Sequence, residues 1–179
     1  MSVQDDLLRA AEHVAAEIEG FKVEVVEDRI VMTPQSHIQS WTILDVQVAA
    51  MSAGVRKERL LSDVLIDFPG ESPRAPDVAI VEEGARAPFS HDDLLAAVEI
   101  VSSENDSHDY VLKLGQYARF GVPLYLVVDP FRGECTLYAR PADGKYAKQE
   151  TFRYGETITL RLADGSAVEL PTADFRRKD

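Results

Sequence analysis

Two carboxylates and a lysine are the residues of this sequence whose types and surroundings best suit chemistry. Glu99 lies inside the apolar run Ala96 to Val101, which is typical of a strand buried on both faces of a sheet. A buried, ionised carboxylate needs a partner, because removing its charge from water is costly. Glu99 therefore binds a metal ion, or it forms a structural ion pair with a Lys or Arg, and this residue alone does not decide between the two.

Asp77 is the second carboxylate, and it follows Pro76 at the start of the apolar run Val78 to Val81. Taken alone, Asp77 fits a turn residue. Two carboxylates on adjacent strands can, however, converge on one hard cation. Mg²⁺ binds through a few carboxylate oxygens and keeps several waters, which leaves room for a substrate phosphate. Asp77 and Glu99 together therefore predict a site for Mg²⁺ or Mn²⁺.

Lys113 lies on an expected helix with Asp109 and Tyr117 at a spacing of four residues, so the three line one face. In one interpretation Asp109 and Lys113 form a surface ion pair, while Tyr117 packs against the sheet. In the other, Lys113 points back toward Glu99, where its ammonium could stabilise charge on a phosphate. The spacing alone favours the surface pair.

The elements that must position these residues follow from hydrophobic periodicity and turn residues. Helical spacing predicts helices over 3–18, 38–53 and 107–120, and β-rich runs predict strands at 21–26, 29–33, 61–68, 78–81, 94–101, 124–128, 136–140, 146–152 and 157–162. The order strand, helix, strand over 94–128 is a crossover that makes its two strands parallel neighbours. The last three strands predict a C-terminal antiparallel meander. We expect residues 1–179 to form a single α/β (α+β) domain.

Composition limits the function classes. The 179 residues carry a formal net charge of −12, which argues against duplex DNA as a partner, since Lys and Arg contacts to phosphate supply most of that affinity. The one cysteine, Cys135, cannot form an internal disulfide. No apolar run approaches the roughly 20 residues that span a membrane, and the acidic N-terminus does not fit a signal peptide. A cytoplasmic protein is the simplest expectation.

Four segments resemble the Uma-two family of restriction-endonuclease-like, or PD-(D/E)XK, nucleases. They are Pro76-Asp77-Val, Val98-Glu99-Ile-Val-Ser102, the pair Asp109 and Lys113, and Tyr117-Ala-Arg-Phe-Gly-Val-Pro-Leu-Tyr-Leu-Val-Val-Asp-Pro130. The stretch from Glu24 to Met32 looks like the early hairpin of the family, and His37 matches the His that opens its next helix. The resemblance covers nearly the whole chain and is specific between Asp77 and Pro130.

The resemblance implies a mixed β-sheet flanked by helices and an Mg²⁺-dependent endonuclease acting on DNA. Asp77 and Glu99 would be the metal ligands, and Glu24 is either a further metal ligand or an exposed hairpin residue. The superfamily places its Lys two residues after the Glu, where this chain has Val101, so Lys113 from the following helix would replace it. The candidate substrate-binding residues are His37, Ser102 and His108.

The chain also departs from the family pattern, and this keeps a second function open. The loop 103–108 lacks the arginines often found there, which would be natural phosphate contacts. With the charge of −12, this motivates the alternative to the nuclease, a catalytically inactive interaction module in which Glu99 and Lys113 form a structural ion pair. If the chain is instead a nuclease that cuts both strands, a homodimer is expected, because two-fold symmetry suits that reaction.

Overall fold

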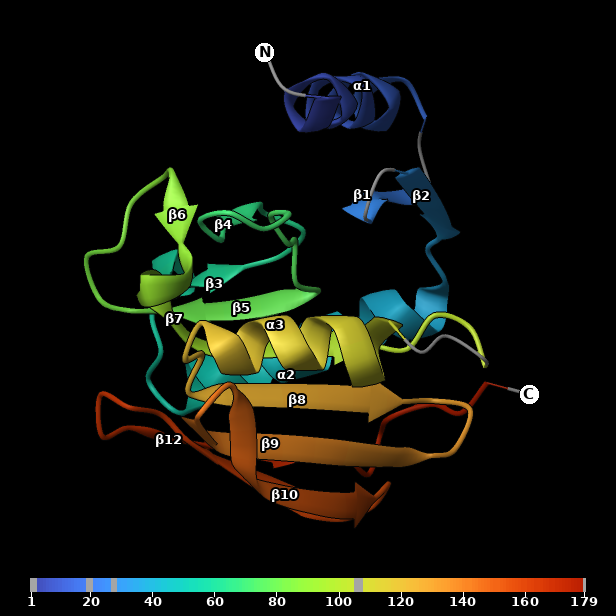
Figure 1. The fold of residues 1–179 in the computed structure, drawn as a ribbon. Helices are drawn as coiled ribbons and strands as arrows, with labels where there is room; N and C mark the ends of the chain where they lie inside the picture. The colour runs from blue at the N-terminus through green and yellow to red at the C-terminus, as the bar shows by residue number, and fades with distance from the viewer. Residues whose placement is uncertain (1–2, 19–20, 27–28, 105–107, 179) are drawn as a thin grey trace.

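The structure is a computed structural model that describes residues 3–18, 21–26, 29–104 and 108–178. Its centre is a six-stranded sheet with the strand order β10-β9-β8-β7-β5-β3 (Figure 1). The strands are β3 (Leu60–Leu61), β5 (Val78–Val81), β7 (Leu94–Ile100), β8 (Leu124–Asp129), β9 (Glu134–Ala142) and β10 (Lys145–Arg153). β7 and β8 are parallel and the other neighbours are antiparallel. The expected mixed sheet is confirmed.

The parallel pair depends on the helix between β7 and β8. A π-helix over His108–Lys113 continues directly into α3 (Leu114–Arg119). Gly121 then turns the chain with a φ of 71°, a conformation that glycine adopts without steric cost. The predicted strand–helix–strand crossover is confirmed. The π-helical first half is not predicted by the apolar spacing, which does not separate a short π-helix from an α-helix.

Both faces of the sheet are covered, because successive side chains of a strand point to opposite sides. One face packs against α2 (His37–Ser52) and the hairpin of β11 (Thr157–Arg161) and β12 (Ala167–Pro171). The other packs against Tyr117 of α3, against Ile66 of β4 (Ile66–Asp67) and against Phe68 just after it. β4 pairs with β6 (Phe89–Ser90). Every residue of β7 is consequently buried, as its apolar sequence predicts.

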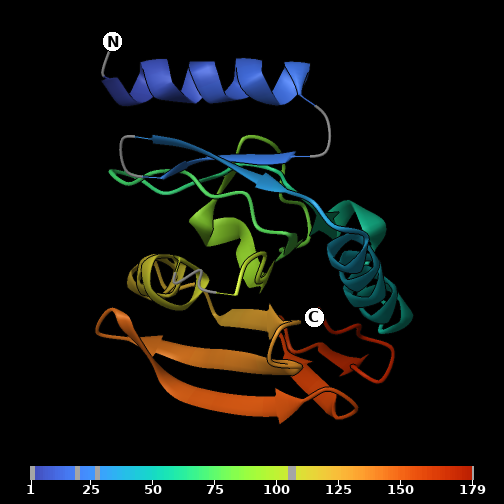
Figure 2. The same cartoon turned by 90° about the vertical axis from the view of Figure 1, so that its right-hand side faces the viewer.

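The N-terminal helix and hairpin form a layer of their own. α1 (Val3–Glu17) packs mainly on β1 (Phe21–Val26), which pairs with β2 (Arg29–Pro34) in a two-stranded sheet. Within the described residues, neither strand of this hairpin pairs with the six-stranded sheet. Figure 2 shows the hairpin between α1 and the rest of the chain. The hairpin can therefore place side chains over the central sheet without belonging to it.

Two segments differ from the strands that the sequence predicts. The run 61–68 contains two short strands, because β3 pairs antiparallel with β5, whereas β4 pairs parallel with β6. Asp63 between them has a φ of 54°, a left-handed conformation that interrupts extended structure. At the C-terminus β10 continues the antiparallel sheet as expected, but β11 pairs with β12, a strand that the sequence analysis does not predict.

Helix α2 is apolar on its outer face as well as on its inner one. Ala50 is fully buried against the sheet, whereas the exposed large side chains recur at a spacing of three and four residues. These exposed residues are Trp41, Leu44, Val48 and Met51. None of the helices in the described ranges is both long and apolar enough to span a membrane.

Cys135 offers a direct test of the packing around β9. Its side chain is fully buried in the sheet core, and burial, together with the carboxylates of Asp129 and Glu134, raises the pKa of the thiol to about 12. The thiolate is the reactive form, so iodoacetamide should alkylate the native protein at least about a hundredfold more slowly than the protein in guanidinium chloride. Mass spectrometry measures both rates. Equal rates would contradict this packing.

Candidate active site

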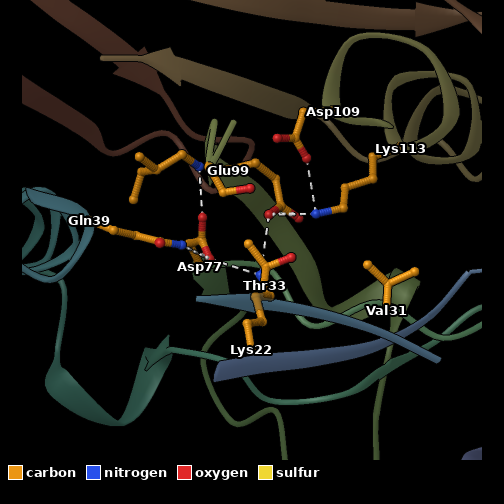
Figure 3. A pocket seen from close by; sticks show the side chains of 10 residues that line it. Lys22, Val31, Thr33, Gln39, Asp77, Glu99, Asp109 and Lys113 are labelled. Atoms are coloured by element: carbon orange, nitrogen blue, oxygen red, sulfur yellow. Dashed lines mark hydrogen bonds and ion pairs between the residues drawn. The ribbon is translucent and has the colours of Figure 1, made fainter. Parts of the chain in front are cut away.

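Asp77, directly before β5, lies opposite Glu99 of the neighbouring strand β7. Val78 pairs with Val98 in the antiparallel register of β5 and β7. In this register Asp77, which precedes Val78, lies beside Glu99, which follows Val98 (Figure 3). Each retains only 1% exposure. The backbone N–H of Ile100 donates a hydrogen bond of 2.7 Å to Asp77 Oδ2, which holds this carboxylate against β7.

Lys113 reaches Glu99 from the helix that follows β7. Its Nζ lies 2.9 Å from Glu99 Oε2 and 3.0 Å from Asp109 Oδ1. Tyr117, one turn further along, donates a hydrogen bond of 3.1 Å to Glu99 Oε1. Both interpretations of the helical spacing are thus present together, because Lys113 pairs with Asp109 and also points at Glu99. The Asp109–Lys113 pair is buried, however, and does not lie on the surface as the first interpretation expects.

A second lysine, Lys22, enters the site from β1 of the hairpin. Its Nζ lies 2.8 Å from Asp77 Oδ1, 3.5 Å from Glu99 Oε2 and 3.5 Å from Asp63 Oδ1. The Lys22 side chain is buried, although its strand belongs to the outer layer. Figure 3 shows Lys22 and Lys113 approaching the two carboxylates from different elements. The site therefore contains two cationic side chains.

Gln39 closes the site from the first turns of α2. Its Nε2 donates a hydrogen bond of 3.2 Å to Asp77 Oδ1, while its buried Oε1 accepts no hydrogen bond from the described residues. The cavity between these groups measures about 20 Å³ and is lined in part by Lys22, Thr33, Gln39, Asp77, Glu99 and Ser102. A polar cavity of that size holds about one water molecule or one small ion.

The pKa values of the two carboxylates shift in opposite directions. Burial is the largest influence on Asp77 and raises its pKa, which the charge of Lys22 only partly offsets. Burial also disfavours ionisation of Glu99, but the attraction of Lys113 and Lys22 and the hydrogen bonds it accepts together lower its pKa. Asp77 is therefore the carboxylate whose ionisation depends more on an added cation.

The other residues proposed from the sequence lie in different places. Ser102, just after β7, lines the cavity. His37 begins α2 on the surface, where its ring packs edge-on against Trp41 with centroids 4.8 Å apart. Glu24 lies on β1 and His108 begins the π-helix, but their side chains are outside what the structure describes. Substrate binding by His37 and His108 and metal binding by Glu24 stay predictions.

Lys22 and Gln39 are candidate site residues that the sequence patterns did not predict. Gln39 had a detectable signal, since it shares a spacing of three and seven residues with the buried Thr42 and Val46, so it lies on the inner face of α2. Lys22 alternates with the apolar Phe21 and Val23 along a strand. That alternation separates the two faces of the hairpin, but it does not indicate which face covers the sheet.

The oxygen atoms in the cavity suit a hard divalent cation. Among the described residues there is no cluster of three or more His, Cys, Asp or Glu side chains placed to hold a metal, which is the set that structural zinc requires. Mg²⁺ needs only one or two carboxylates and completes its shell with water. The carboxylates of Asp77 and Glu99 meet that need, and the unpaired Gln39 Oε1 adds a neutral oxygen beside them. The residues present therefore fit Mg²⁺ or Mn²⁺.

The mixed sheet with its crossover helix over the two carboxylates is a restriction-endonuclease-like fold. The chain belongs to the Uma2 family, described as "Putative restriction endonuclease", whose model matches residues 6–173. The resemblance seen in the sequence to this family is confirmed.

One solved structure supports the fold. The chain is similar to the crystal structure of "a putative nuclease belonging to DUF820" from Anabaena variabilis, with 17% sequence identity, a TM-score of 0.52, and coverage of 76% of this chain and 79% of that one. It is also similar to a cryo-electron microscopy structure of a DrdV–DNA complex, with 13% identity and a TM-score of 0.39. That match covers 83% of this chain but 12% of the other. No curated protein matches the chain.

Asp109 gives the site a pH dependence with a defined sign. Burial, partly offset by Lys113, raises its pKa from 3.8 to about 6. The folded state therefore binds more protons than the unfolded state between these values, and the stability that this group contributes is lost as the pH rises through 6. Relative to Asp109→Asn, the free energy of unfolding of the wild type should fall by up to about 3 kcal/mol between pH 4 and pH 7. Urea titrations measure this difference, and a flat or rising one would contradict it.

Proposed function

We propose that this chain is a divalent-metal-dependent endonuclease that hydrolyses DNA phosphodiester bonds. The observation that carries the proposal is the placement of Glu99, a fully buried carboxylate on the central strand, between Asp77 and Lys113. A fold of this size does not need such a costly arrangement for stability, since apolar residues of similar volume often stabilise as well or better. Buried titratable groups with shifted pKa values around a cavity are typical of functional sites.

In this proposal each residue has a chemical role. Asp77 and Glu99 would hold Mg²⁺ or Mn²⁺, with Gln39 Oε1 facing the same cavity. A bound divalent cation supplies Lewis-acid polarisation of the scissile phosphate and lowers the pKa of its bound water. Lys113 provides a fixed positive charge for the negative charge that develops on the phosphate. Asp109 and Glu99 hold the Lys113 ammonium in position before substrate arrives.

Membership of the Uma2 family is the reason for proposing DNA as the substrate, whereas the negative net charge of the chain opposes DNA binding. The net charge of −12 disfavours approach to a polyanion, so the contacts must come from a few local cations. Lys178 is one candidate, because its Nζ donates a 3.0 Å hydrogen bond to the backbone oxygen of Ser102 at the cavity. A homodimer stays part of the proposal, since two copies related by a two-fold axis could cut both strands.

Plasmid cleavage tests the proposal most directly. At low salt with Mg²⁺ or Mn²⁺, the wild type should nick or linearise a supercoiled plasmid, while Glu99→Ala should lose at least about a hundredfold in rate, as expected for loss of a metal ligand in a metal-dependent hydrolase. Glu83→Ala is the matched control, because Glu83 is exposed on the loop after β5, and this variant should cut like the wild type. Equal cutting by Glu99→Ala would assign the activity to a contaminant, and a folded wild type that never cuts would favour the second function below.

The second candidate function is an inactive interaction module. The observation that favours it is the Glu99–Lys113 ion pair at 2.9 Å, which lies in a network already balanced by Lys22. A network of this kind can serve fold specificity alone. The cavity beside the two carboxylates has room for only about one water molecule, so a phosphodiester could not reach them without a rearrangement of the side chains around it.

Melting curves with and without Mg²⁺ separate the two functions. If the network is structural only, Glu99→Gln should lose about 3–5 kcal/mol of stability, and neither protein should respond to Mg²⁺. If the site binds metal, the wild type should gain roughly 1–3 kcal/mol at Mg²⁺ concentrations of about ten to a hundred times Kd. Glu99→Gln should then show no gain with Mg²⁺. A metal response of equal size in both proteins would exclude Glu99 from the binding site.

A further inference from the structure

We infer that Lys22 occupies the cation position between Asp77 and Glu99, and that a divalent metal ion binds by displacing its ammonium group. The inference rests on the proposed function, because it concerns the same metal site. It assigns to Lys22 the role of an internal competitor that holds the two carboxylates together until metal arrives.

The distances place Lys22 where a bridging ion would lie. Its Nζ is 2.8 Å from Asp77 Oδ1 and 3.5 Å from Glu99 Oε2, so it faces both carboxylates at once (Figure 3). Mg²⁺ would need to come within about 2.1 Å of its oxygen ligands. The adjoining cavity of about 20 Å³ is too small to hold the Lys22 ammonium and the metal ion more than a few ångströms apart. The ammonium and the metal ion therefore compete for the same oxygens.

The charge of the buried cluster leads to the same conclusion. Three buried carboxylates, Asp77, Glu99 and Asp109, face the ammonium groups of Lys22 and Lys113. Without Lys22 the cluster has a formal charge of −2, which a divalent cation matches. With Lys22 retained between the same two carboxylates, its ammonium and the divalent ion would lie within a few ångströms of each other in a buried site, and like charges repel strongly there.

Lys22 also has a position to move to. Asp63 Oδ1 lies 3.5 Å from its Nζ, and the Asp63 side chain is 37% exposed, whereas Asp77 and Glu99 are almost fully buried. Turning toward Asp63 would keep the ammonium paired while it leaves the other two carboxylates. β1 belongs to a separate two-stranded sheet in the described chain, so this movement breaks no hydrogen bond of the central sheet.

Mn²⁺ binding and lysine labelling test this inference together. Isothermal titration should give a Kd for Mn²⁺ at least about tenfold lower in Lys22→Met than in the wild type, since removing a unit charge a few ångströms from an ion has a large effect on its binding. In the wild type, Mn²⁺ should increase acetylation of Lys22 by an N-hydroxysuccinimide ester at least about threefold, because release exposes a side chain that is now buried. Peptide mass spectrometry reads the labelling, and buried Lys113 is the internal control that should stay protected.

The outcomes separate this inference from the proposed function. If Mn²⁺ binds the wild type in a Glu99-dependent manner, but Lys22 stays protected or Lys22→Met binds no more tightly, displacement is wrong and the metal site stands. If neither the wild type nor Lys22→Met binds Mn²⁺, both the metal site and the displacement are wrong. Binding by Lys22→Met alone supports the inference. Should Lys22→Met fail to fold, labelling of the wild type, with Glu99→Ala as the variant that should not respond, decides the question.

Discussion

Burying two ionised carboxylates side by side is the constraint on which the rest of this structure depends. Asp77 and Glu99 repel each other, and each loses its hydration, with an effective cost of several kcal/mol per ion. Three elements outside the two strands contribute groups that offset this cost. β1 provides Lys22, α2 provides Gln39, and the helix after β7 provides Lys113 and Tyr117. The carboxylates therefore fix how these separate elements must pack.

The topology follows from the same requirement. A carboxylate on a central strand is reachable only from an element that crosses the face of the sheet, and the connection between the parallel strands β7 and β8 must cross it. That connection carries Lys113, Asp109 and Tyr117, and the π-helix lies over the segment that includes the first two. Single π-turns are frequent at functional sites, because they change which side chains share a helix face. Here the two charged side chains meet beside Glu99.

The sequence predicts the part of the site that local patterns determine. Glu99 is recognisable because a charged residue interrupts an apolar strand, and Lys113 because it follows at helical spacing. The pairing of Asp77 with Glu99 needs only the neighbouring strand β5. Lys22 is 55 residues from Asp77 in sequence, and no local pattern fixes where the hairpin lies. The break at Asp63 and strand β12 were missed for a similar reason, because pairing partners decide whether short runs become strands.

If the chain binds metal as proposed, Lys22 separates folding from metal binding. Where the ligands of a metal site have no other partners, as in small zinc domains, the metal is required for folding. Here the two lysines already compensate the carboxylates, so the chain can bury Asp77 and Glu99 without metal. The affinity of the proposed site for a divalent ion would then be the difference between two attractions, that of the ion to the carboxylates and that of Lys22, which is given up. Such a site would stay folded at low metal concentration and bind its ion weakly, so substrate oxygens that also coordinate the ion would favour its retention.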